Sequence, residues 1–150
     1  MKRILIPLDG SPTSELVLPA VENLAIAAGA ELVLLRAIPA TTLPLTVAEL
    51  REAEQYLRSA AERLEGRGCK KVRWIVWYGG AVEAIVESTE RQQADLVAMV
   101  THGWKRLASL LFPSVAQQVL REAGVPVLLY NAAAARRSVE PQGRTAALRV

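Results

Sequence analysis

The chain has few of the residues that form disulfides and metal sites. Its 150 residues include one cysteine, Cys69, and one histidine, His102. A single cysteine excludes an intramolecular disulfide, and these two residues alone do not supply a zinc ligand set. The sequence therefore predicts no metal site, and the lack of disulfides is typical of a protein of the reducing cytoplasm.

Long hydrophobic runs are also absent, although hydrophobic residues make up 51% of the chain. No apolar stretch reaches the roughly 20 residues that a membrane-spanning helix needs. The segment after Met1-Lys2-Arg3 has the pattern of a short strand and not that of a signal peptide. We therefore expect no membrane segment and a cytoplasmic location, and the length suits one domain with one core.

The positive charge is concentrated at one end of the chain. The formal net charge is +3, and residues 131–150 hold four arginines and one glutamate. Without them, residues 1–130 contain 14 basic and 14 acidic side chains. The pI of 9.4 therefore reflects this end of the chain. We expect no nucleic-acid partner, because that inference needs a basic stripe with aromatic side chains on one face of a domain.

Short apolar runs alternate with segments of helical spacing. Runs that are apolar throughout, and are followed by turn residues, are typical of strands buried on both faces. The predicted strands are 3–8, 31–38, 72–78, 95–100 and 125–130, and the predicted helices are 14–28, 47–65, 81–92 and 114–123. This alternation predicts an α/β fold with a five-stranded parallel sheet and helices on both faces.

The sequence predicts one domain over residues 1–130. Residues 131–150, NAAAARRSVEPQGRTAALRV, lack sustained apolar periodicity. We interpret them as a mobile tail, with a short helix over the alanines as the alternative.

Two segments follow predicted strands at the edge where open parallel sheets bind ligands. They are LDGSPTS after the first strand and THGWKRLASLLFPS after the fourth. Neither contains GxGxxG or GxxxxGK[ST], so the sequence argues against a dinucleotide fingerprint or a P-loop.

The chain resembles the universal stress protein family. The resemblance rests on ILIPLDGSPTSE, on the Gly-Gly after the third strand, on ADLVAMVTHG and on SVAQQVLREAGVPVLLY. It covers nearly all of residues 2–130. It implies a Rossmann-like fold with a five-stranded parallel sheet, which the apolar pattern also predicts, and assembly as a homodimer.

In its ATP-binding branch the family carries a motif of Gly, two residues, Gly, nine residues, Gly, then Ser or Thr. On this chain the glycines fall on Val100, Gly103 and Pro113, and the hydroxyl residue falls on Ser114. Val100 adds a branched side chain at the strand end, and Pro113 removes an N–H that a phosphate oxygen could accept. Both departures oppose polyphosphate binding, whereas Ser114 lies near a predicted helix start that favours an anion.

The resemblance also implies positions for the nucleoside. It places adenine and ribose near Pro7, Asp9 and Ala37. Lys105 and Arg106 are candidates for phosphate contacts, with solvated loop charges as the alternative. The carboxylate of Asp9 also suits ordinary turn and cap chemistry, and both roles stay open.

A hydrolase triad of His102, Asp9 and Ser114 is a weaker hypothesis. Neither Ser11 nor Ser114 lies in a GxSxG elbow, and no oxyanion hole can be named. We therefore expect no catalytic residue.

The last predicted strand is the expected dimer edge. An apolar edge strand can pair with a second chain, and Val125, Val127, Leu128 and Leu129 form this one. The resemblance implies a homodimer through this strand. The alternative is that the segment from Asn131 covers the edge.

These observations predict a regulatory or interaction module of the stress response. Its nucleotide pocket is expected to be weak or lost, and its signalling partner is unknown. The alternative is a protein that binds ATP or AMP and hydrolyses ATP slowly. Magnesium would then arrive with the nucleotide, because the sequence holds no metal cage of its own.

Overall fold

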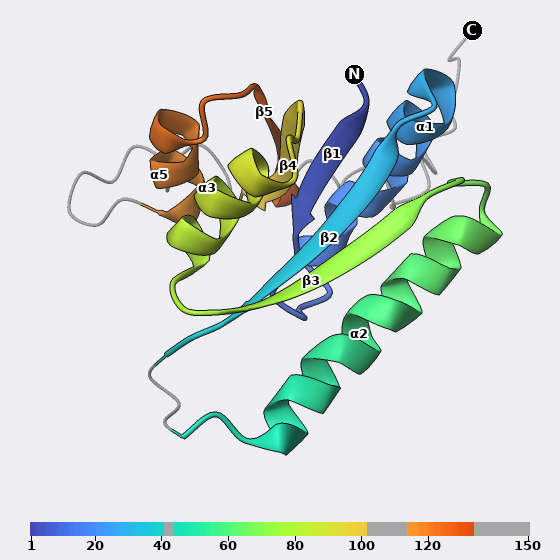
Figure 1. Cartoon of the computed structure of the whole chain (residues 1–150). Coiled ribbons are helices and arrows are strands. Elements are labelled where there is room, and N and C mark those ends of the chain that lie inside the picture. Colours follow the sequence, from blue (N-terminus) through green and yellow to red (C-terminus); the bar gives the residue numbers. More distant parts are fainter. Residues whose placement is uncertain (41–43, 102–113, 134–150) are drawn as a thin grey trace, which may run out of the picture.

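The computed structural model describes residues 1–40, 44–101 and 114–133 (Figure 1). Its strands are β1 (Arg3–Pro7), β2 (Glu31–Ile38), β3 (Val72–Tyr78), β4 (Leu96–Thr101) and β5 (Val127–Asn131). Its helices are α1 (Leu18–Ala28), α2 (Val47–Gly66), α3 (Ala81–Arg91) and α5 (Val115–Glu122), and a 3-10 turn, Ser14–Val17, precedes α1. Strands and helices alternate as the sequence predicts.

The strands form one parallel sheet in the order β3-β2-β1-β4-β5. β1 lies at the centre, where Leu5 is in register with Val33 of β2 and with Val97 of β4. β2 and β3 are added to the sheet on one side of β1, and β4 and β5 are added on the other side. The predicted fold class is confirmed.

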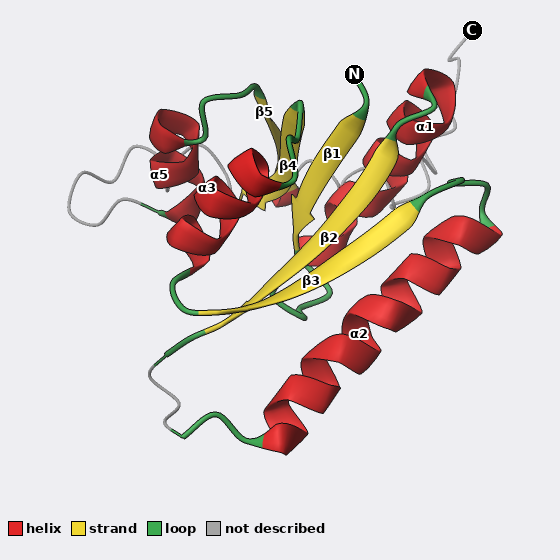
Figure 2. Cartoon of the chain, viewed as in Figure 1, coloured by secondary structure: helices red, strands yellow, loops and turns green. Residues whose placement is uncertain are grey.

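Helices cover both faces of the sheet (Figure 2). One core cluster lies under α1 and α2 and includes Ile4, Leu34 and Leu57, while the other lies under α3 and α5 and includes Leu5, Val33 and Val119. Adjacent residues of a strand thus enter different clusters, because side chains alternate between the two faces. This explains why the strand sequences are apolar throughout.

The predicted boundaries hold to within two residues, apart from the first helix. The 3-10 turn occupies the beginning of the predicted helix 14–28, and α1 starts at Leu18. Pro19 explains the division, because proline has no N–H to donate to a carbonyl four residues earlier. Of the described helices, none is both long and apolar enough to cross a membrane.

The end of the predicted domain lies within an ordered segment. β5 continues through Asn131, Ala132 is buried, and Ala132 and Ala133 are helical. The rest of the predicted tail, 134–150, lies outside the described residues.

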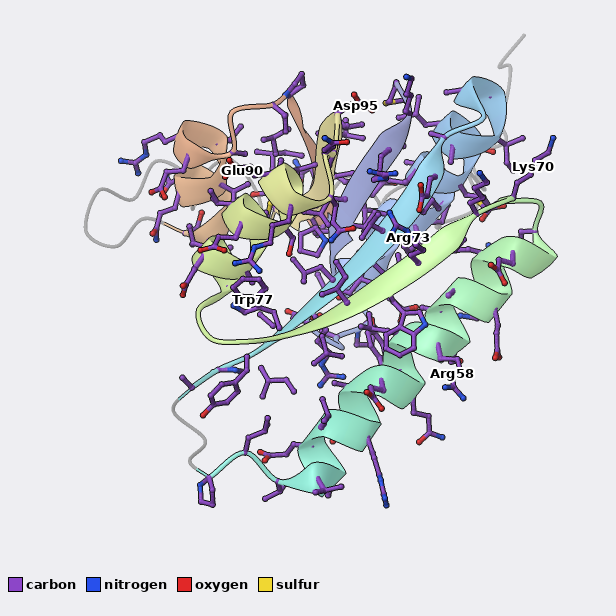
Figure 3. All side chains as sticks on the ribbon, in the orientation of Figure 1. Arg58, Lys70, Arg73, Trp77, Glu90 and Asp95 are labelled. Carbon is purple, nitrogen blue, oxygen red and sulfur yellow. The ribbon has the colours of Figure 1, made fainter. Side chains whose placement is uncertain are left out.

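The tryptophans of the edge strand β3 pack on opposite faces. Trp74 packs against the cluster under α1 and α2, and Trp77 packs against the cluster under α3 and α5. The guanidinium of Arg91 lies 5.4 Å from the Trp77 ring centroid, and Figure 3 shows Trp77 beside α3. These aromatic side chains therefore cover the outer part of the sheet.

An ion-pair cluster joins the amino ends of three strands. Glu31 of β2 accepts hydrogen bonds from Arg3 Nε at 3.1 Å and Arg3 Nη2 at 3.0 Å, and it also accepts one from Arg73 of β3. Burial favours a raised pKa for Glu31, but the hydrogen bonds and charges of the two arginines outweigh it. They hold the pKa below its ordinary value of 4.5.

We predict that Glu31→Gln lowers the free energy of unfolding by about 1 kcal/mol at pH 7. Because the pKa is lowered in the folded state, the stabilisation is complete above pH 4.5 and is lost as the pH falls through the folded-state pKa. Urea unfolding of both proteins at several pH values measures the difference. Glu87→Gln is the control, since Glu87 pairs with Arg91 on the exposed surface of α3. A Glu31→Gln effect that did not diminish in acid would contradict this explanation.

Candidate functional site

A cleft of about 330 Å³ opens at the carboxyl ends of β1 and β4. This is where the strand order reverses, because β2 lies on one side of β1 and β4 on the other. Ligands of open parallel sheets bind at such a reversal. The volume lies within the usual range of small-molecule sites, about 300–1,000 Å³.

The cleft is lined by strand ends, the loop after β1 and two helix starts. Its walls are mainly apolar and include several hydroxyl groups. The described lining residues are Pro7, Leu8, Asp9, Ser11, Thr13, Ser14, Leu35, Ala37, Ala81, Ile85, Met99, Val100, Thr101, Ser114, Val115 and Ala116. Of these, Asp9 alone carries an ionisable side chain.

Five residues singled out in the sequence line this one cleft. They are Pro7, Asp9 and Ala37, assigned to the nucleoside, and Val100 and Ser114 of the glycine motif. The structure thus brings together the ends of β1, β2 and β4 with the start of α5. The other predicted positions, His102, Gly103, Lys105, Arg106 and Pro113, lie outside the described residues.

Asp9 shapes the loop that follows β1, residues 9–13, which we call the Asp9 loop. Its Oδ1 accepts a hydrogen bond of 2.8 Å from the Ser11 N–H, and Ser11 Oγ accepts one of 3.1 Å from the Ser14 N–H. Gly10 has φ of +87°, which favours glycine. Asp9 therefore performs the turn chemistry expected of it while its exposed side chain lines the cleft.

The electrostatic state of Asp9 follows from these contacts. Partial burial favours a raised pKa, but hydrogen bonds from Ser11 and Ser14 outweigh it and hold the pKa of Asp9 below its ordinary value of 3.8. Asp9 is therefore a carboxylate at neutral pH. A carboxylate accepts hydrogen bonds from hydroxyl or amino groups of a ligand and repels a phosphate placed close to it.

Ser114 caps helix α5 at the opposite wall. The Gln117 N–H donates to Ser114 Oγ at 3.3 Å, and the Ser114 N–H donates to Gln117 Oε1 at 2.9 Å. These reciprocal bonds form a capping box, which fixes the start of the helix. The helix dipole makes this wall favourable for an anion.

Val100 both lines the cleft and packs against the core. The residue lines the cleft, but its side chain packs against the cluster under α1 and α2. Met99, one position earlier, packs against the other cluster and forms part of the cleft wall. Part of the bulk of Val100 is therefore accommodated by the core.

Several lining residues were not identified in the sequence. Thr101, buried at the end of β4, was identifiable from the rule that ligands bind at strand ends. Ala81 and Ile85 were not, because they reach the cleft through the packing of α3 on the sheet. That packing joins segments far apart in the chain and leaves no local signal in the sequence.

The structure adds little to the triad hypothesis. Asp9 and Ser114 both line the cleft, but Ser114 Oγ serves as the helix cap and His102 is not described. Within residues 1–40, 44–101 and 114–133, no cluster of three or more His, Cys, Asp or Glu side chains has the arrangement of a metal site.

β5 forms one edge of the sheet, as expected for a dimer strand. Val125, Val127 and Leu129 pack against the cluster under α3 and α5. Leu128 faces away from them and is 37% exposed. Among the described residues, β5 therefore pairs with β4 alone and presents an apolar side chain at this edge.

The fold and the cleft define a class of α/β proteins that bind ligands where the strand order reverses. Within that class, the model of the universal stress protein family matches residues 1–131. The chain belongs to the universal stress protein family.

Individual relatives support this assignment. Universal stress protein Slr1230 from Synechocystis is 31% identical over 129 residues, which are 86% of this chain and 42% of that protein. The chain thus spans less than half of that relative. Universal stress protein MJ0531 from Methanocaldococcus jannaschii is 31% identical over 138 residues, 85% of this chain and 81% of that protein.

A solved structure shares the fold. It is a universal stress protein in complex with cAMP, 24% identical, with a TM-score of 0.72. The match covers 87% of this chain and 97% of that protein.

We predict that Ser114→Ala lowers the free energy of unfolding by about 1 kcal/mol, because it removes the acceptor of the capping box. Ser114→Thr keeps a hydroxyl acceptor and should lose less than half of that amount. Denaturant unfolding of the three proteins tests the role of the cap. Equal stability of Ser114→Ala and wild type would show that the capping box does not hold α5 in place.

Proposed function

We propose that this chain is a regulatory module of the stress response that binds an adenine nucleotide weakly in the cleft between β1 and β4. The observation that carries the proposal is the convergence of Pro7, Asp9, Ala37 and Ser114 on one cleft of about 330 Å³. Membership of the family supports the ligand class, and a protein of the same fold is in complex with cAMP.

The part of the cleft near β1 and β2 suits a nucleoside. Its apolar wall, which includes Leu35, Ala37 and Met99, can contact both the edge and the face of a purine. The carboxylate of Asp9 can accept a hydrogen bond from a ribose hydroxyl or from the adenine amino group. In this proposal, apolar contact supplies affinity and Asp9 supplies orientation.

The part of the cleft near α5 suits a phosphate less well. The start of α5 and the hydroxyl of Ser114 favour an anion, but two of the three motif glycines are replaced. Pro113 has no N–H, and the loss of one hydrogen bond to a charged group costs about 1.5–3 kcal/mol, or one to two decades of affinity. We therefore propose weak and not absent binding, because the cleft is open and Val100 packs partly into the core.

This role requires binding without covalent chemistry by a protein nucleophile. In this proposal Asp9 orients the nucleoside and Ser114 contacts the phosphates. The motif assigns Gly103 to the phosphates as well, with Lys105 and Arg106 as candidates for charge neutralisation, and these three residues lie outside the described part of the chain. When a triphosphate binds, magnesium accompanies it, since this ion usually coordinates through phosphate oxygens. We place the module in the cytoplasm, with a signalling partner that responds to nucleotide occupancy.

Isothermal titration with AMP, and with ATP plus magnesium, tests the proposal on protein stripped of carried-over nucleotide. We expect dissociation constants in the range of about 10 μM to 1 mM, as for a site with intact nucleoside contacts and impaired phosphate contacts. Restoring glycine at Val100 and Pro113 together should tighten ATP binding about tenfold or more, because it restores one donor and removes bulk.

Asp9→Asn is the matched variant, since it keeps the size of the side chain and removes its charge. It should weaken AMP binding, whereas Glu87→Gln on the surface of α3 should not. Absence of heat up to millimolar AMP and ATP would contradict the proposal. ATP turnover in the same samples would instead favour a slow ATPase.

The position of β5 at the edge of the described sheet supports a second proposal, a homodimer formed through this strand. Among the described residues this edge pairs with no further strand, and it offers the exposed Leu128 to a second copy. Sedimentation velocity of the full chain should show a dimer, and Leu128→Lys should shift it towards monomer. A wild-type monomer at about 100 μM, far above a typical homodimer dissociation constant, would contradict this proposal.

A further inference from the structure

Arg36 is a largely buried arginine on the sheet face opposite the cleft. It lies near the end of β2, between Leu35 and Ala37, which both line the cleft. Its side chain is 19% exposed, although arginine is among the residues least often buried. A cation in this position needs partners that compensate for its lost hydration.

Two residues of α2 contact the Arg36 guanidinium. Its Cζ lies 5.1 Å from the ring centroid of Tyr56, within the range of a cation–π contact. Its Nη2 lies 3.6 Å from a carboxylate oxygen of Glu52. Burial, together with the neighbouring Glu15 carboxylate, raises the pKa of Tyr56 to about 12, so the ring stays neutral across the physiological range.

The same guanidinium packs against the Asp9 loop. A Cβ atom added to Gly10 would lie 3.1 Å from both Cζ and Nη1 of Arg36, and 3.2 Å from Nη2. The guanidinium therefore lies close to Gly10, and a side chain at this position would require Arg36 to shift by a few tenths of an ångström. Glycine suits this position because of the close approach of Arg36 and because of its φ of +87°.

This close approach connects the Asp9 loop with β2 and α2. The last backbone hydrogen bond between β1 and β2 runs from the Leu8 N–H to the Leu35 carbonyl, at 2.8 Å. Beyond it, the hydrogen bonds of Asp9, Ser11 and Ser14 given above join residues within the same segment. They shape the loop, and Arg36 supplies a contact that connects it to β2 and α2.

We infer that Arg36 is a positioning residue of the cleft, whose guanidinium, held by Tyr56 and Glu52 of α2, sets the Asp9 loop in its ligand-binding position. The inference rests on the proposed function, because it assigns Asp9 to the nucleoside. The inference extends the proposed site to Arg36, a residue that does not line the cleft and that acts on Asp9 through Gly10. A planar guanidinium suits this role, since it offers flat faces to the ring and the glycine and stays charged.

A second link between the same elements provides a matched control. Glu15, in the 3-10 turn after the Asp9 loop, forms an ion pair of 2.9 Å with Arg63 of α2. Arg63→Gln removes an arginine that also joins this segment to α2, but that contacts Glu15 and not Gly10. A general effect of loosening the segment would appear in both Arg36 and Arg63 variants.

The first experiment measures AMP binding by isothermal titration for wild type, Arg36→Gln and Arg63→Gln. We expect Arg36→Gln to raise the dissociation constant about tenfold, comparable with the loss of one well-placed hydrogen bond to Asp9, and Arg63→Gln to stay within twofold. In an Asp9→Asn background, Arg36→Gln should add less than twofold, because the group that it positions is gone. A purely structural role would lower affinity equally in both backgrounds.

The second experiment needs no ligand. Hydrogen–deuterium exchange of the amides in residues 10–14 reports the order of the loop, and exchange should be about tenfold faster in Arg36→Gln and unchanged in Arg63→Gln. Carboxyl NMR should show the pKa of Asp9 rising in Arg36→Gln, as the hydrogen bond from Ser11 becomes intermittent. If Arg36→Gln does not fold, Arg36→Lys replaces it. Lysine keeps the positive charge but lacks the planar guanidinium. The increases in amide exchange and in the pKa of Asp9 should therefore be smaller than in Arg36→Gln.

The outcomes separate the inference from the proposed function. If wild type binds AMP and the Arg36 variants leave both affinity and exchange unchanged, the inference is wrong and the proposed function stands. If wild type does not bind AMP, the proposed function fails, and loop exchange decides whether Arg36 holds the loop. Faster exchange with a tenfold loss of affinity that disappears in Asp9→Asn supports the inference.

Discussion

The pairing of β1 with β4 is the constraint on which the rest of the structure depends. Leu5 of β1 is in register with Val97 of β4 on one side and with Val33 of β2 on the other, so β1 is buried among parallel strands. Connections between parallel strands are right-handed. The chain crosses the sheet one way from β1 through β2 to β3 and the other way from β3 through β4 to β5, which places α1 and α2 on one face and α3 and α5 on the other. The loops at the carboxyl ends of β1 and β4 separate at this point. The cleft is a consequence of that reversal.

Side chains on the two faces of β2 contribute to the cleft in different ways. Leu35 and Ala37 face the cleft and form part of its apolar wall, while Arg36 between them faces α2. This division follows from the alternation of side chains along a strand. Arg36 thus approaches the Asp9 loop from the sheet face opposite the cleft. A substitution on α2 that disturbs Tyr56 or Glu52 can reach the cleft without touching it.

The fold was predictable because a buried parallel strand has a local signature. Each strand is a short apolar run followed by turn residues, and only the division at Pro19 altered a predicted helix. The site was predictable in part. The family resemblance singles out Asp9 and Ser114, and both line the cleft. Each also has a local signal in the sequence, because Asp9 suits a turn and Ser114 suits a helix cap.

The remaining features depend on contacts between distant segments. Nothing near Arg36 in the sequence indicates that its guanidinium lies close to both Gly10 and Tyr56. The direction in which Val100 packs follows from the pairing of β4 within the sheet, so its position in a motif says little about how much of the cleft it fills. The spacing of apolar residues indicates whether a segment is a helix or a strand, whereas these contacts depend on how the helices and strands pack against one another.

Chemical-shift mapping of the ¹⁵N-labelled full chain with AMP tests most directly whether this cleft is the ligand site. The amides of Asp9, Ala37, Thr101 and Val115 come from four separate segments that meet there. They should shift together and saturate with one dissociation constant, while amides at the amino ends of the strands, such as Glu31, should not move. Saturable shifts confined to another surface, or no shift at millimolar AMP, would contradict the assignment of the cleft as a nucleotide site.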